Sequence, residues 1–179
     1  MSASETEPWL RGPIEGIPAL LLPAAHAFQM AWEDVERAVA GLTDQQVWHS
    51  VEGIPPLGFH LAHLSGSTDR LLSYARGEAL TPAQREVLLS ERTLMDTRPA
   101  LSVILERWRA TVQVAQVQLA ATDEATLLEP RLVGRRELPS TVLGLIFHAA
   151  EHAARHTGQV VTTAAVVRGV APGSAVLPD

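Results

Sequence analysis

Four stretches of the sequence repeat apolar residues every three or four positions, and this spacing constrains the fold more than any other feature. Residues three and four apart share one face of a helix, so each stretch predicts an amphipathic helix with one face toward a core. We expect these helices at about 18–42, 56–77, 99–119 and 140–168. No convincing pair of strands competes with them. The sequence therefore predicts an all-α fold, an antiparallel four-helix bundle.

Two shorter elements are expected between the long helices. Thr81, Pro82 and Gln84 have the order of a capping box with proline at the first helical position. A short connecting helix should begin there and cross an end of the bundle. Between 129 and 138, a proline, a Val-Gly pair and two arginines interrupt the helical period, which favours a small hairpin or loop before the last helix.

The length of 179 residues fits one domain with a self-sufficient core. We expect an N-terminal arm at 1–16, the bundle at 17–169 and a C-terminal tail at 170–179. The chain contains no cysteine, which excludes disulfides, thiolate metal ligands and a cysteine nucleophile. Any thiol chemistry needs a thiol borrowed from another molecule.

Charge and hydropathy restrict the partners. The net charge is -6 and the basic residues are scattered, a distribution that disfavours nucleic acid as a partner. The first ten residues lack the basic and apolar regions of a signal peptide, and no uncharged apolar run reaches the roughly 18 residues typical of a membrane span. We therefore expect a cytoplasmic protein with no membrane partner.

The last expected helix carries three histidines at four-residue steps: His148, His152 and His156. Neighbours in this series lie on one helix face, about 5–6 Å apart at Cβ, so two of them can share a metal ion. The outer two are about 12 Å apart along the axis, so a third ligand should come from another helix. The second expected helix offers His60 and His63, and spacing does not choose between them. The alternative is a set of half-buried or surface histidines without metal.

The spacing also argues against one well-known class of zinc enzyme. The metalloprotease motif H-E-x-x-H has a glutamate directly after its first histidine to act as general base. Here Ala153 follows His152. A metalloprotease of that type is therefore disfavoured.

Two strings resemble a known family. HLAHLSGSTDRLL, which begins at His60, is similar to the second-helix motif of the DinB-like, or DinB/YfiT, superfamily of metal-dependent enzymes. HAAEHAARHTGQ, which begins at His148, resembles the H-x-x-x-H-x-G-Q signature of that family. The turn at 133–136 also looks like its link into the last helix. The resemblance covers roughly residues 18–170.

This resemblance implies a four-helix bundle with a three-histidine metal site near one end, often with zinc or nickel, and commonly a homodimer. The ligands that it implies are His63, His152 and His156. His60 and His148 are left to pack, to orient a ligand or to relay protons.

Other polar residues are weighed as candidates for catalysis. Arg70 either contacts an anionic substrate or forms an ion pair. Gln159 lies three residues after His156 and can reach a metal-bound water or a ligand ring. Arg135 and Arg136 either close over an acidic group or form a solvated basic turn. The catalytic candidates are thus Gln159, Arg70 and the two non-ligand histidines.

The resemblance and the histidines together predict a metal-dependent enzyme that acts on a small molecule. Three protein ligands leave an open position for water or a thiolate, as in catalytic zinc sites. The reaction is then hydrolysis or thiol S-transfer of the mycothiol or bacillithiol type, with a low-molecular-weight thiol as second cofactor. The alternative is a non-catalytic bundle, linked to stress response, that binds a metal or small molecule.

Overall fold

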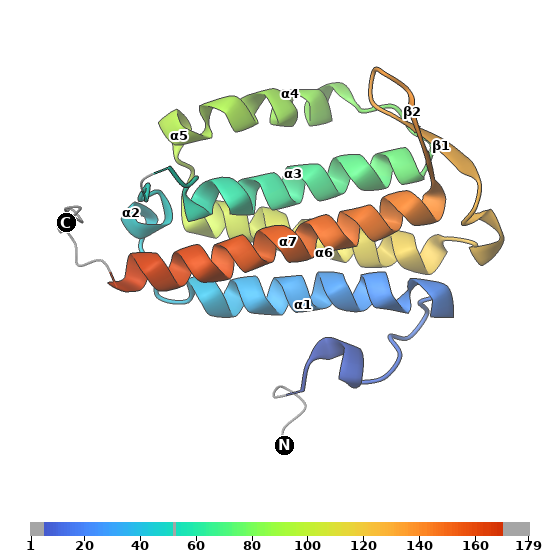
Figure 1. Cartoon of the computed structure of the whole chain (residues 1–179), viewed down its shortest axis with the longest axis horizontal. Helices are drawn as coiled ribbons and strands as arrows, with labels where there is room; N and C mark the ends of the chain where they lie inside the picture. The colour runs from blue at the N-terminus through green and yellow to red at the C-terminus, as the bar shows by residue number, and fades with distance from the viewer. Residues whose placement is uncertain (1–5, 52, 170–179) are drawn as a thin grey trace.

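Four long helices form the body of the protein in a computed structural model that describes residues 6–51 and 53–169. They are α1 (Leu22–Val39), α3 (Leu57–Ala75), α6 (Leu101–Ala121) and α7 (Val142–Gly169). Both α6 and α7 pack against α1 and against α3 (Figure 1). The predicted helical fold is confirmed. The proposed tail at 170–179 and residues 1–5 of the arm lie outside the described residues.

Neighbouring helices are not all antiparallel. Arg168, near the end of α7, donates to the carbonyl oxygen of Ala40 just after α1, so these two helices run the same way. Gln118, near the end of α6, donates to the carbonyl oxygen of Leu72 near the end of α3, so this pair is parallel too. The α3–α7 and α1–α6 pairs are antiparallel (Figure 1). The expectation of a wholly antiparallel bundle is therefore wrong.

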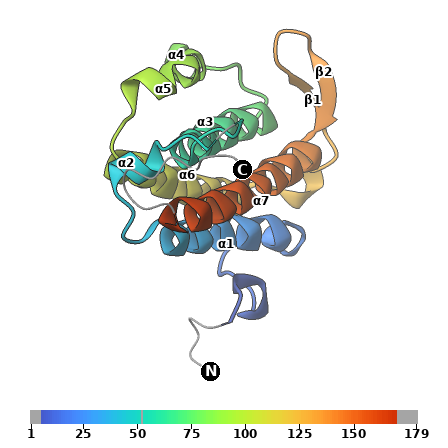
Figure 2. The same cartoon turned by 60° about the vertical axis from the view of Figure 1, so that its left-hand side comes forward.

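The parallel arrangement arises because the connection between α3 and α6 carries the chain back along the molecule. This connection contains α4 (Pro82–Ser90), a 3-10 turn (Glu91–Thr93) and α5 (Leu94–Thr97). The capping box predicted at Thr81 is present. However, α4 lies alongside α3 rather than across an end, because Gln84 donates to Asp69 at 2.9 Å and to Ser73 at 2.6 Å (Figure 2).

The remaining elements are short. Strands β1 (Pro130–Val133) and β2 (Leu138–Thr141) form an antiparallel hairpin in which Val133 pairs with Leu138. This is one of the two forms, hairpin or loop, that the sequence favoured. Its turn needs positive φ at Gly134 (67°) and Glu137 (49°). The other elements are α2 (Asp44–Val47) and 3-10 turns at Pro8–Leu10, Ala19–Leu21 and Glu124–Thr126.

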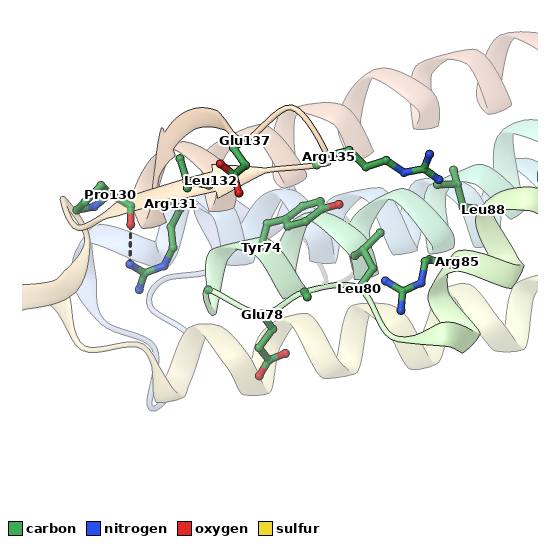
Figure 3. A pocket seen from close by; sticks show the side chains of 13 residues that line it. Tyr74, Glu78, Leu80, Arg85, Leu88, Pro130, Arg131, Leu132, Arg135 and Glu137 are labelled. Carbon is green, nitrogen blue, oxygen red and sulfur yellow. Dashed lines mark hydrogen bonds between the residues drawn. The ribbon is translucent and has the colours of Figure 1, made fainter.

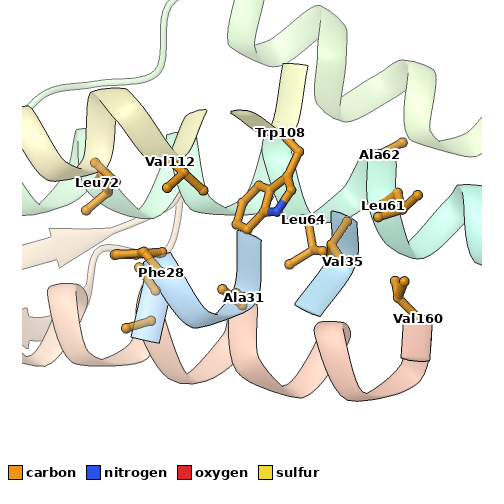
Figure 4. Close-up of a cluster of buried hydrophobic side chains, with 14 of the residues drawn as sticks. Phe28, Ala31, Val35, Leu61, Ala62, Leu64, Leu72, Trp108, Val112 and Val160 are labelled. Atoms are coloured by element: carbon orange, nitrogen blue, oxygen red, sulfur yellow. The ribbon is translucent and has the colours of Figure 1, made fainter. Parts of the chain in front are cut away.

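The core lies between the four long helices (Figure 4). Trp108 is fully buried, and Val35 of α1 and Leu64 of α3 lie beside it in Figure 4. Small buried residues on α7, such as Ala149 and Ala153, let that helix approach its neighbours closely. None of the helices described is long and apolar enough to cross a membrane.

Candidate metal centre

Three histidines gather where α3 packs against α7. His63 comes from α3, and His152 and His156 lie one turn apart on α7. One nitrogen of each ring can be chosen so that all three lie within 4.8 Å of one another. The ring centroids are 4.5–5.2 Å apart. Nitrogens that share a tetrahedral ion at 2.0–2.1 Å lie about 3.3 Å apart, so modest turning of the rings brings them to bonding distance.

Each of these rings has a neighbour at Nδ1. Nδ1 of His63 donates to Oε2 of Glu91 at 2.8 Å. Nδ1 of His152 lies 3.4 Å from the hydroxyl of Ser67, and Nδ1 of His156 lies 3.1 Å from Nδ1 of His60. A proton on Nδ1 leaves the lone pair on Nε2, which is the form that ligates a metal. The donor set therefore fits a divalent transition metal.

Glu91 is the best-anchored of these neighbours. Its second oxygen, Oε1, accepts a hydrogen bond from Nη1 of Arg70 at 2.7 Å, and both side chains are only 11–12% exposed. Burial raises the pKa of Glu91, but the hydrogen bonds and charges of His63 and Arg70 outweigh it, and the pKa lies below its ordinary value. Glu91 is therefore ionised near neutral pH and holds the His63 ring.

Gly66 makes room for this contact, because a Cβ at residue 66 would lie 2.7 Å from Oε1 of Glu91 and 2.8 Å from Nη1 of Arg70. We expect Gly66→Ala to displace these two flexible ends and to weaken zinc binding about 10- to 100-fold, as loss of a ligand's orienting partner does. Competition with a chromogenic chelator measures the affinity.

Gly158→Ala is the matched control for this prediction. Residue 158 also lies on a helix, two residues after His156, and a Cβ there would meet nothing within 4 Å. It should leave zinc affinity unchanged. Equal affinity of Gly66→Ala and the parent protein would show that the Glu91 contact does not support the site.

The surroundings of His60, His152 and His156 favour the neutral form of these three rings. Burial, followed by the charges of the neighbouring rings His152, His63 and His60, lowers the pKa of His156 to about 4. Burial and nearby positive charges also lower the pKa of His152, and burial and His63 lower that of His60. Neutral imidazole is the form that binds a metal, so these rings do not need to lose a proton near pH 7.

The same shifts predict a pH dependence for the metal-free protein. Because the folded-state pKa of His156 lies below its ordinary value of 6.5, the unfolded chain binds more protons between about pH 6.5 and pH 4. Stability should therefore be fully present above this range and should fall as the pH drops through it. Thermal unfolding measured at several pH values in the presence of a chelator tests this. His156→Gln should make stability depend less on pH. An unchanged slope in that variant would contradict the assignment.

The other sequence candidates lie around the cluster with different contacts. His60 is buried and adjoins His156, which suits a role in orienting that ring. Arg70 forms the ion pair with Glu91, so it does not present a free charge to a substrate. His148 is half exposed and pairs with Glu151 at 3.3 Å; its ring centroid is 5.7 Å from that of His152, but it lies outside the three-nitrogen group. Gln159 is exposed on α7.

Sequence reasoning missed Glu91, Ser67 and Gly66. Glu91 lies 28 residues from its partner His63 and comes from the connecting segment, so no helical spacing could indicate the contact. Ser67 carried a weak signal, since it follows His63 by four residues and donates back to its carbonyl oxygen at 2.7 Å.

Comparison with known proteins agrees with this architecture. The sequence model of a family described as the DinB superfamily matches residues 27–160. A crystal structure of a conserved protein from Enterococcus faecalis has a similar fold, with a TM-score of 0.67 and 17% identity over 84% of this chain and 98% of the other. At that identity the likeness concerns the fold alone. No curated protein matches the sequence.

Proposed function

The chain belongs to the DinB superfamily, and from that premise we propose that it is a metal-dependent enzyme whose divalent ion, zinc or nickel, is held by His63, His152 and His156. The observation that carries the proposal is the set of three ring nitrogens within 4.8 Å of one another. No Asp or Glu in the described part of the chain belongs to this set. An ion held by the three histidines therefore keeps positions open for a substrate, as in catalytic zinc sites.

A divalent ion at this position supplies a Lewis acid that activates water or a thiol for attack near neutral pH. The protein's own contribution is orientation. Glu91 holds His63, Ser67 and His60 face Nδ1 of the other two rings, and Arg70 keeps Glu91 charged. We propose Gln159 and His148, both exposed on α7, as residues that meet the substrate or move its protons.

The reaction classes that we propose are hydrolysis and thiol S-transfer with a mycothiol- or bacillithiol-type thiol. The absence of cysteine means that the chain supplies no thiol of its own, so transfer needs a small thiol as co-substrate. Both reactions use the same feature, a nucleophile activated beside the three imidazoles.

The test is turnover by the zinc- or nickel-loaded protein with two panels, activated esters and amides for hydrolysis, and electrophiles with mycothiol, bacillithiol or cysteine for transfer. We expect turnover in one panel that the metal-free protein and His156→Ala both lack. His148→Asn tests the role of His148 in proton transfer, and we expect its metal content to be unchanged. A metal-loaded protein that turns over neither panel would favour the alternative, a non-catalytic metal- or small-molecule-binding bundle linked to stress response.

We further propose a cytoplasmic homodimer whose folding unit is 17–169. Support for self-association comes from exposed apolar side chains on the outer face of α6, with Val114 56% and Val117 70% exposed. The net charge of -6 argues against a nucleic-acid partner. Light scattering of the purified protein distinguishes the dimer from the monomer.

A further inference from the structure

A cavity of about 710 Å³ lies between the β1–β2 hairpin, the start of α4 and the end of α3 (Figure 3). Its volume falls in the range of about 300–1,000 Å³ typical of small-molecule sites. Tyr74 on α3 forms one wall. Tyr74 follows His63 by eleven residues, or about 16 Å along the helix by its rise per residue. The Tyr74 wall of the cavity therefore lies well away from the histidines.

Two arginines enter the cavity from opposite sides. Arg135 extends from the hairpin turn and Arg85 from α4, and the Tyr74 ring lies to the left of both guanidinium groups in the view of Figure 3. Neither arginine forms a salt bridge with any residue in the described ranges, 6–51 and 53–169. Both guanidinium groups are thus available to an anion.

The other charged groups at the cavity are largely occupied. Arg131 pairs with Glu129 at 3.1 Å and donates to the carbonyl oxygen of Ala75 at 2.9 Å. Glu78 pairs with Arg76 at 2.7 Å. Glu137 is the remaining acid among the lining residues. The two unpaired arginines therefore make this cavity locally positive in a protein of net charge -6.

Apolar side chains complete the cavity. Leu88 is 42% exposed and Leu132 56% exposed, and both line it together with Leu80 and the Tyr74 ring. A ligand with an apolar body would remove this surface from water, which is favourable in proportion to the area covered. The lining thus combines two arginines that form no salt bridge with apolar walls.

We propose that this cavity binds a small organic carboxylate with an apolar body. The carboxylate lies between Arg85 and Arg135, and the apolar part packs against Tyr74, Leu80 and Leu88. The site is separate from the three histidines and needs no metal. It therefore goes beyond the proposed function and does not depend on it.

The experiment uses 1-naphthoate as probe, with 1-naphthalenemethanol as its neutral counterpart, titrated into the full chain by calorimetry and followed by amide chemical shifts. We expect naphthoate to bind more tightly than the alcohol and to shift amides of the hairpin and α4. Arg85→Gln and Arg135→Gln should each weaken naphthoate binding about tenfold, the effect of losing one charge-assisted hydrogen bond. These arginines are exposed, so their replacement should leave thermal unfolding unchanged.

Arg136→Gln is the matched control, because Arg136 is the next residue in the same turn and does not line the cavity. It should bind naphthoate like the parent protein. Equal binding of the alcohol and the carboxylate, or equal weakening by Arg136→Gln, would overturn the proposal. The titration is run with and without bound zinc. Unchanged affinity supports a separate site, and binding that requires zinc would place the carboxylate on the metal and refute it.

Discussion

Replacing His63, His152 or His156 with alanine is expected to weaken zinc binding by more than about a hundredfold, because each change removes a direct ligand, whereas loss of an orienting partner alone costs about 10- to 100-fold. The three rings contribute the nitrogens that lie within 4.8 Å of one another. Chelator competition on the purified variants measures the affinity, and circular dichroism confirms that each remains helical.

Two other histidines provide graded controls for this experiment. His148 lies one turn from His152 on the same helix but outside the three-nitrogen group. The His148→Ala variant should therefore bind zinc like the parent protein. His60→Ala removes the neighbour of His156 and should lower affinity only about tenfold. A variant at His148 that loses zinc as completely as His152→Ala would contradict the assignment of ligands.

Replacement of Trp108 with alanine is expected to have the largest effect on folding, a loss of about 3–5 kcal/mol in the free energy of unfolding. Trp108 is fully buried in the core between the four long helices, and its removal leaves a cavity that helix packing cannot readily close. Urea denaturation of the metal-free protein measures the change.

Two further substitutions sharpen this second prediction. Trp9 is 57% exposed, and Trp9→Ala should change stability by less than about 0.5 kcal/mol. The indole Nε1 of Trp108 has no hydrogen-bond partner in the described structure, so Trp108→Phe keeps most of the apolar contact and removes an unpaired donor. It should cost much less than alanine. Equal losses for phenylalanine and alanine would show that ring volume is not what stabilises the core.

The helices were predictable because their physical causes are local. The capping box at Thr81 and Gln84 determines where α4 begins, and Gly134 permits the turn of the hairpin. The path of the chain was not predictable in this way, since the direction of α6 depends on α4 lying along α3. That in turn depends on contacts such as Gln84 to Asp69, which join residues on separate elements.

The candidate site shows the same division. His152 and His156 share a helix face by spacing alone, and this much follows from the sequence. The choice of His63 over His60 came from family resemblance, and the structure places His63 in the three-nitrogen group and His60 beside it. Glu91 could not be identified, because only the folded connection between α4 and α5 brings it to His63.

The most direct test of the metal-centre proposal is the metal content of untagged protein prepared without nickel, before and after incubation with zinc and dialysis. Elemental analysis is paired with X-ray absorption of the loaded sample. A three-histidine centre should hold close to one ion per chain, with nitrogen neighbours at about 2.0–2.1 Å that include three imidazoles. Parent protein that retains no zinc, nickel or manganese after dialysis would contradict the metal-centre proposal. So would a His156→Ala variant that binds zinc as well as the parent protein.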